Sequence, residues 1–294
     1  MLLTFLSTLY VGSQMERAAS PSTLSELLAG WTFSVPLMAI LLAHEFGHYF
    51  AGRYHRVDVS PPYFIPMPFF LLGTMGAVIR MRGEIRSRAA LLDIGASGPL
   101  AGMAVALPVV IVGLLISPVE ALPQDGTPYL IEGRSILYLA LIELTKGEIP
   151  VGHDVMLSPT ALAGWAGLLV TMINLVPVGQ LDGGHIAYAL FGPEQDRYSE
   201  WIRFSLPAIA LLVGVAYALP AYLDGLRGER LVQEFAAGAH WLIWAGLLWW
   251  MKRAAGAKHP PTGSVPLGPG RRKVAWFTLI LFALLVMPSW LRIQ

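Results

Sequence analysis

The chain has 294 residues, of which 55% are apolar and only 13% carry a formal charge, against about 25% in ordinary globular proteins. This composition and a mean hydropathy of +0.59 indicate a membrane protein, and a net charge of +1 offers no excess that would attract nucleic acid. The absence of cysteine excludes disulfides, thiolate metal ligands and cysteine nucleophiles, so any metal is held by His, Asp or Glu.

Six apolar stretches are long enough, or nearly long enough, to cross a membrane as helices. A hydrocarbon core about 30 Å thick needs roughly 17 to 25 apolar residues at a rise of about 1.5 Å per residue. We predict such helices over the following ranges: 31–52, 91–116, 160–176, 204–223, 235–251 and 274–291. The opening stretch 2–11 is shorter, and we expect a spanning or half-spanning helix there rather than a signal peptide, because Arg17 follows the apolar run instead of preceding it. The predicted fold class is therefore an all-α multi-pass membrane protein with about six to seven membrane helices.

The connections between these helices differ in charge and composition. We expect a surface or partly embedded helix over 136–144, whereas four prolines alternating with glycines exclude regular structure from 254–272. Fourteen of the twenty Lys and Arg residues lie in 53–90, in 252–273 or at Arg197 and Arg203, and six lie in the alternate connections. Cytoplasmic connections carry the excess of positive side chains, so we predict that the larger group faces the cytoplasm.

His44, Glu45 and His48 form the H-E-x-x-H pattern inside the predicted helix 31–52. Residues four apart lie on one face of a helix, so both imidazoles can bind one Zn²⁺ while Glu45 reaches a water molecule at the metal. The alternative is a group of three side chains that only hydrogen-bond one another. That alternative is costly in a membrane, because a charged residue at mid-helix costs roughly 2.5–3.5 kcal/mol, and the pattern therefore favours a metal site.

A catalytic zinc normally has three protein ligands, so a third ligand must come from elsewhere in the chain. Asp182 is the favoured candidate because it is an acid in an otherwise uncharged stretch after the predicted helix 160–176, and His185 is its rival. We expect Pro177 and the Gly183–Gly184 pair to interrupt the helix there and to let the backbone approach the metal. The other histidines lack ligand-like spacing and are expected to be surface or hydrogen-bonded residues: His55, His153, His240 and His259.

Three motifs, in this order, resemble those of the site-2 protease family of intramembrane zinc metalloproteases. They are H-E-x-x-H at 44–48, a glycine-proline element at 98–102 and N-x-x-P-x-x-x-x-D-G at 174–183, and the resemblance covers about 30–285. The segment 62–82 looks like the short membrane-associated β-like loop of the bacterial and plastid branch. The connection 53–90 is too short for the PDZ domain that some family members insert. Taken alone, Gly98 and Gly102 indicate only close helix packing.

The resemblance implies an intramembrane zinc metalloendopeptidase that hydrolyses peptide bonds within or near transmembrane segments of membrane proteins. It implies that His44, His48 and Asp182 bind one Zn²⁺ per chain. Glu45 would act as general base and acid, and Asn174 would contact the substrate or the transition state. An extended substrate could also pair with a strand edge in the loop at 62–82. A metal transporter and a catalytically silent membrane chaperone are the alternative functions, although transport requires no general base beside the ligands.

The expected partners are a transmembrane protein substrate and the lipid bilayer, with no nucleic acid, and the sequence does not indicate an oligomeric state. We expect a single domain over 1–294, with a core at 31–191 that carries the zinc site and additional membrane helices at 192–294. The expected location is a bacterial inner membrane with the active site towards the cytoplasm. A plastid membrane is the alternative.

Overall fold

The computed structural model describes residues 1–17, 20–83, 85–123, 129–255 and 262–293, and most of them are helical. The helices are α1 (Leu2–Arg17), α2 (Leu24–Ala29), α3 (Trp31–Tyr54), α4 (Arg88–Ile116), α5 (Ile136–Lys146), α6 (Pro159–Asn174), α7 (Asp182–Phe191), α8 (Glu194–Leu223), α9 (Glu229–Phe235), η1 (Ala236–Gly238), α10 (Ala239–Ala255) and α11 (Pro269–Leu285). Each predicted apolar stretch coincides with one of these helices over most of its length. The largely helical fold is therefore confirmed.

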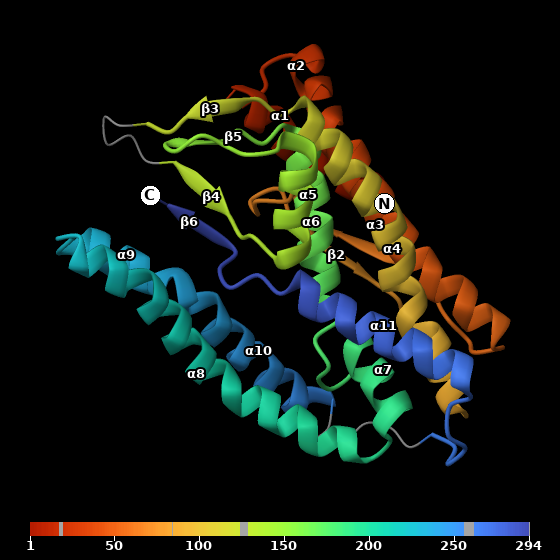
Figure 1. Cartoon of the computed structure of the whole chain (residues 1–294). Coiled ribbons are helices and arrows are strands. Elements are labelled where there is room, and N and C mark those ends of the chain that lie inside the picture. Colours follow the sequence, from red (N-terminus) through yellow and green to blue (C-terminus); the bar gives the residue numbers. More distant parts are fainter. Residues whose placement is uncertain (18–19, 84, 124–128, 256–261, 294) are drawn as a thin grey trace.

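The centre of the molecule is a bundle in which α3, α4, α6 and α7 pack against one another, with α1 and α11 alongside (Figure 1). Small residues let these backbones approach closely. A Cβ at Gly113 of α4 would lie 2.3 Å from the backbone nitrogen of Ala161 in α6, and a Cβ at Gly164 would lie 2.6 Å from Cα of Val110. A larger side chain at either glycine would push α4 and α6 apart.

Short strands complete the fold. β1 (Tyr63–Pro66) and β2 (Thr74–Val78) pair antiparallel and form a hairpin within 62–82, where a β-like loop was expected. β3 (Val119–Ala121) pairs with β5 (His153–Val155), and β4 (Leu130–Glu132) pairs with β6 (Leu291–Ile293). The last pairing returns the end of the chain to the connection between α4 and α6.

Three predicted boundaries are wrong. α11 ends at Leu285 and not at residue 291, because Pro288 cannot continue a helix and the chain turns into β6. α8 begins ten residues earlier than predicted, since its first turns are polar and carry no apolar signal. The linker predicted over 254–272 is shorter, because α11 begins at Pro269 and proline is well tolerated at the first position of a helix. Residues 256–261 of this linker lie outside the described part of the chain.

The connections rich in Lys and Arg meet at one end of the bundle (Figure 1). Arg271 at the start of α11 donates from Nε and Nη2 to the Asp93 carboxylate of α4 at 2.9 and 2.7 Å, and His55 after α3 lies 2.8 Å from the same carboxylate. At the other end Arg292 of β6 pairs with Glu234 of α9 at 3.3 Å. These contacts agree with the predicted division of the connections into two groups, and the cytoplasmic location of the basic group stays a prediction.

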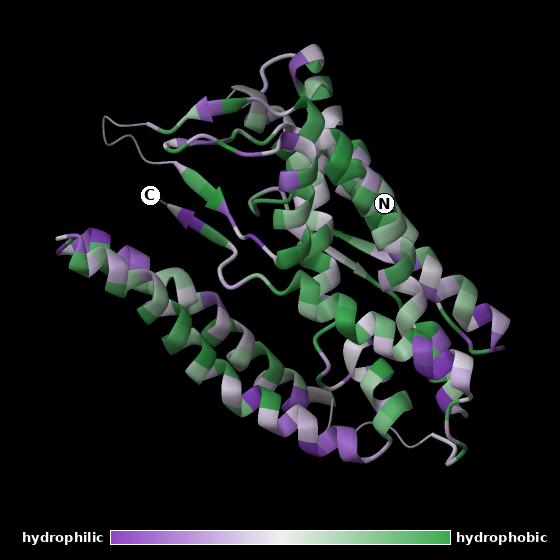
Figure 2. Cartoon of the chain, in the orientation of Figure 1, coloured by the Kyte–Doolittle hydropathy of each residue, from purple (hydrophilic) through white to green (hydrophobic). Residues whose placement is uncertain are grey.

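In the part of the chain that the structure describes, two helices, α4 and α8, are long and apolar enough to cross a membrane. Only 22% of the most apolar 18-residue segment of α8 is buried within the protein. Most of the apolar side chains of this segment therefore require another apolar environment. Figure 2 shows apolar residues along the helices and hydrophilic ones mainly towards helix ends and in some of the short strands. These features support a membrane protein, and the other predicted spans are treated under the proposed function.

Candidate metal centre

α3 brings His44, Glu45 and His48 to the interior of the bundle. The helix is continuous from Trp31 to Tyr54, so the two histidines, four residues apart, project from the same face. His44, Glu45 and His48 are only 3%, 8% and 9% exposed. Ionisable side chains are seldom buried to this extent unless they are paired or bind a metal.

Asp182 follows α6, as predicted, but it begins a separate helix that was not predicted. α6 ends at Asn174, residues 175–181 form an irregular connection, and Asp182 is the first residue of α7. The partial positive charge of a helix N-terminus stabilises a carboxylate at this position. The expected interruption is present at 175–181 and contains Pro177, but Gly183 and Gly184 take no part in it, because both lie in the first turn of α7.

These two glycines instead allow α7 to start close to the connection that precedes it. A Cβ at Gly183 would lie 2.0 Å from the carbonyl oxygen of Leu175, and one at Gly184 would lie 2.3 Å from that of Gly179. Side chains at either position would displace the N-terminus of α7 and move Asp182 with it.

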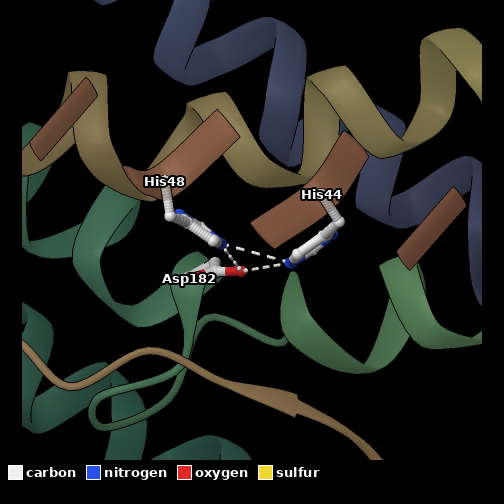
Figure 3. A group of neighbouring side chains, drawn as sticks. All are labelled: His44, His48 and Asp182. Atoms are coloured by element: carbon white, nitrogen blue, oxygen red, sulfur yellow. Dashed lines mark hydrogen bonds and ion pairs between the residues drawn. The ribbon is translucent and has the colours of Figure 1, made fainter. Parts of the chain in front are cut away.

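The side chains of His44, His48 and Asp182 point towards one another (Figure 3). The Nε2 atoms of the two histidines are 3.2 Å apart, and Oδ2 of Asp182 lies 3.4 Å from Nε2 of His44 and 3.2 Å from Nε2 of His48. Two imidazole nitrogens and one carboxylate oxygen form a group that could hold a metal ion. Within the described residues no second group of three such side chains converges in this way.

A backbone carbonyl of α4 orients His48. Nδ1 of His48 lies 2.8 Å from the carbonyl oxygen of Ile94, which can only accept a hydrogen bond, so Nδ1 carries the proton. The lone pair of the neutral ring is then on Nε2, the atom that faces Asp182. Metal-binding histidines in proteins commonly have such a partner on their second nitrogen.

Three glycines of α4 form the surface on which the site rests. A Cβ at Gly98 would lie 2.1 Å from Nε2 of His48, one at Gly102 would lie 3.2 Å from Cβ and Nδ1 of His44, and one at Gly95 would lie 3.0 Å from Cβ of His185. Close packing was predicted for Gly98 and Gly102, and the structure identifies what they pack against. Gly95 was missed; its spacing of three and seven residues from the other two was the available signal.

The remaining predicted residues lie around this group. Nδ2 of Asn174, at the end of α6, donates to Nε2 of His44 at 3.2 Å. Glu45 lies close enough to His44, His48 and Asp182 for their charges to interact. His185, the rival ligand, lies on α7 with its Cβ against Gly95 and does not belong to the converging group.

The other histidines have the ordinary roles expected of them. His55 is paired with Asp93, and Nδ1 of His240 lies 3.1 Å from the carbonyl oxygen of Ala237. His153 is exposed in β5. His259 lies outside the described residues.

Comparison with known proteins identifies the family. The model of peptidase family M50 matches residues 32–216, which is more than half of the chain and includes both α3 and Asp182. No solved structure matches the chain.

Several plant proteins are similar to the same region. "Probable zinc metalloprotease EGY2, chloroplastic" of Oryza sativa subsp. indica is 35% identical over 175 residues, which are 59% of this chain and 31% of that protein. "Probable zinc metalloprotease EGY1, chloroplastic" of Arabidopsis thaliana is 32% identical over 205 residues, 67% of this chain and 36% of that protein. The chain thus spans about a third of the length of these relatives. On the family match, together with its three motifs, the chain belongs to peptidase family M50, the site-2 protease family.

Proposed function

We propose that the chain is a zinc metalloendopeptidase that cleaves transmembrane segments of membrane proteins. The observation that carries this proposal is the triangle of ligand atoms with sides of 3.2, 3.2 and 3.4 Å. A tetrahedral Zn²⁺ with bonds of about 2.0–2.1 Å places its ligand atoms roughly 3.3 Å apart. His44, His48 and Asp182 therefore match the donor types and the spacing of a zinc site, and they leave a fourth position for a reactant.

Zn²⁺, when bound, supplies the Lewis acidity that activates water near neutral pH and polarises a scissile carbonyl. The protein contributes the orientation of the ligands. Ile94 fixes the tautomer of His48, and the N-terminus of α7 favours the ionised form of Asp182.

Glu45 is the proposed proton carrier. It directly follows His44 on α3 and lies in the same buried environment as the three ligands. In this role its carboxylate takes a proton from the attacking water and then donates it to the leaving amine. Burial keeps this carboxylate away from bulk solvent, so the transferred proton stays in the site.

Asn174 is the proposed contact to the reacting substrate. Its amide donates to Nε2 of His44, the nitrogen whose lone pair a metal would take. With that lone pair engaged, the amide needs another acceptor within about 3 Å, and the oxygen of a bound substrate is the natural one.

The site lies at membrane depth in the proposed arrangement. α3 continues for six residues beyond His48, which at about 1.5 Å per residue puts this ligand roughly 9 Å from the end of the helix that we predict to be cytoplasmic. We propose six to seven spanning helices, α4 and α8 among them, in a single domain over 1–294 with its core at 31–191. The similar plant proteins are named chloroplastic, and both a plastid membrane and a bacterial inner membrane are compatible with this arrangement.

A substrate helix must unwind before its peptide bond can be cleaved, and the hairpin of β1 and β2 is the proposed docking edge for the extended chain. β2 lies against α3, and the hairpin exposes apolar side chains, including Phe69 at 97%, that suit a membrane environment. Proline within 76–79 removes an N–H donor from β2 and should lower cleavage without removing zinc. Unchanged cleavage would refute the docking role.

The experiment for the function itself is Glu45→Gln in vesicles that contain a single-span substrate. We expect zinc to be retained and cleavage to be lost, because the amide keeps the volume of the side chain but cannot accept the proton. Glu143→Gln, on the exposed face of α5, is the matched control and should cleave normally. Undiminished cleavage by Glu45→Gln would refute the assignment, and zinc flux without any cleavage would indicate a transporter instead.

A further inference from the structure

The C-terminal end of α3 carries a polar cavity that has no part in the proposed chemistry. The cavity measures about 290 Å³ and is lined by Arg53, Arg56, Val57 and Asp58. At about 30 Å³ per water molecule, it has room for roughly ten waters, which exceeds the size of a phosphate group. Val57 is buried and forms its apolar wall, while the three charged side chains are exposed.

Within the described residues, no ion pair is found for the two arginines of this cavity. No carboxylate of the described residues lies within ion-pair distance of either guanidinium, and Asp58 does not close the cavity by pairing with them. By contrast, Arg271 at the same end of the bundle is paired with Asp93. Two adjacent guanidiniums with free donors match a phosphate group, which accepts from several N–H groups at once.

The way α3 ends brings these two arginines together. Arg56 has φ of 59°, the only positive φ of a non-glycine residue in the described chain. Its backbone N–H donates to the carbonyl oxygen of Arg53 at 3.0 Å, and Val57 donates to that of Gly52 at 2.9 Å, so the chain folds back over the last turn. Glycine is the residue usually found at such a helix end, yet this position carries an arginine.

An apolar stripe on α3 leads to the cavity. Phe46, Phe50 and Tyr54 are spaced four residues apart and share one face, and the rings of Phe46 and Phe50 stack at 5.7 Å. Phe50 is 64% exposed and Tyr54 is 81% exposed, so the described protein leaves most of these two side chains uncovered. With α3 in the membrane, as the proposed function requires, acyl chains cover the phenylalanines and Tyr54 lies at the interface.

We propose that the cavity binds the headgroup of an anionic phospholipid. The lipid phosphate accepts hydrogen bonds from Arg53 and Arg56, and Asp58 accepts from a hydroxyl of the headgroup. The acyl chains lie along Phe46 and Phe50. Anionic lipids are concentrated in the cytoplasmic leaflet, the side predicted for this end of α3.

The test is lipid retention by the whole protein, measured by native mass spectrometry after extraction from vesicles of phosphatidylglycerol and phosphatidylcholine at 0.15 M salt. At this ionic strength exposed charges farther than about 8 Å from the lipid are screened. We expect selective retention of phosphatidylglycerol. Arg53→Gln with Arg56→Gln should reduce this selectivity roughly 30-fold, which corresponds to about 2 kcal/mol for two lost arginine contacts.

Arg272→Gln with Lys273→Gln is the matched control, because it removes the same charge at the same end of the bundle but outside the cavity. The control should keep the selectivity. Arg56→Gly keeps the backbone conformation and removes one guanidinium, so it should lower retention in a folded protein. An equal loss of phosphatidylglycerol selectivity in both double variants would mean that only the surface potential attracts the lipid, and it would refute the proposed binding site.

Inorganic phosphate distinguishes a lipid from a soluble ligand. We expect millimolar phosphate to leave the bound phosphatidylglycerol in place, because phosphate lacks acyl chains. Complete displacement by phosphate would overturn the lipid assignment. Lipid retention does not depend on cleavage, so the Glu45→Gln experiment tests the proposed peptidase activity independently of the lipid site.

Discussion

Replacing Gly98 by alanine should abolish tight zinc binding although Gly98 is not a ligand. The new Cβ would lie 2.1 Å from Nε2 of His48 and 2.4 Å from the adjacent Cδ2 and Cε1 atoms, whereas ordinary contact begins at 3.4 Å. The ring must therefore move by about 1.3 Å, since 3.4 − 2.1 = 1.3 Å. Metal–ligand distances tolerate only about 0.2 Å, so His48 would be lost as a ligand.

The expected effect is large enough to measure. Changes to residues that merely orient a metal ligand cost about 10–100-fold in affinity, and displacing the ligand itself should reach at least the upper value. We therefore expect zinc affinity to fall by about 100-fold or more, equivalent to about 2.7 kcal/mol. The assay is competition with a fluorescent chelator on purified protein, with helix content and elution volume measured in parallel to establish folding.

Two further glycine variants calibrate this prediction. In Gly246→Ala on α10 the new Cβ meets no atom within 4 Å, so zinc binding should not change. The higher helix propensity of alanine should raise the stability of the folded protein by up to about 1 kcal/mol. Gly102→Ala places its Cβ 3.2 Å from His44, which requires a shift of a few tenths of an ångström and should weaken zinc binding less. A folded Gly98→Ala protein with wild-type zinc affinity would refute the packing argument.

Three other predictions concern stability. Stripping zinc with a chelator should lower the unfolding temperature, because zinc at 100 times its Kd stabilises the folded state by about 2.7 kcal/mol; an unchanged temperature would contradict a site in the folded protein. Arg134→Gln should cost about 1–3 kcal/mol in chemical unfolding, because Arg134 donates to Asp154 at 2.6 Å and to Glu132 at 3.3 Å, and a loss within error would contradict the importance of these contacts. Burial raises the pKa of Glu132 above its usual value, against the opposing charge of Arg134, so the folded state holds this proton more tightly than the unfolded state. The stability gained from this tighter proton binding is complete below the pKa of Glu132 in the unfolded state. It is lost as the pH rises through the pKa of Glu132 in the folded state. Glu132→Gln should therefore gain stability relative to wild type as the pH rises from about 4.5 towards neutrality. A difference in unfolding free energy between the two proteins that does not change with pH would contradict the raised pKa of Glu132.

Local patterns were sufficient to predict most of the longer helices and the three side chains that converge in the structure. The H-E-x-x-H spacing places His44 and His48 on one helix face, and the isolated acid Asp182 marks the third member. Both inferences depend only on the period of a helix and on the cost of charge in an apolar segment.

Contacts between distant segments could not be predicted in this way. The pairing of β4 with β6 joins residues 130–132 to 291–293, and neither strand is long enough to carry an alternating pattern. The end of α6 was predicted to within two residues, but α7 was missed, because its ten residues are too few to stand out as an apolar helix. The contact of Ile94 with His48 involves a backbone carbonyl, which leaves no trace in the side-chain sequence.

The central claim is that His44, His48 and Asp182 hold one zinc ion, and the metal content of two variants tests it most directly. Asp182→Asn and His185→Gln change neighbouring polar residues on α7, but of the two only Asp182 belongs to the converging group of described residues, 3.4 and 3.2 Å from the histidine Nε2 atoms. In purified protein we predict one zinc per chain for wild type and for His185→Gln, and its loss in Asp182→Asn. Zinc retained by Asp182→Asn but lost by His185→Gln would contradict the assignment of the site.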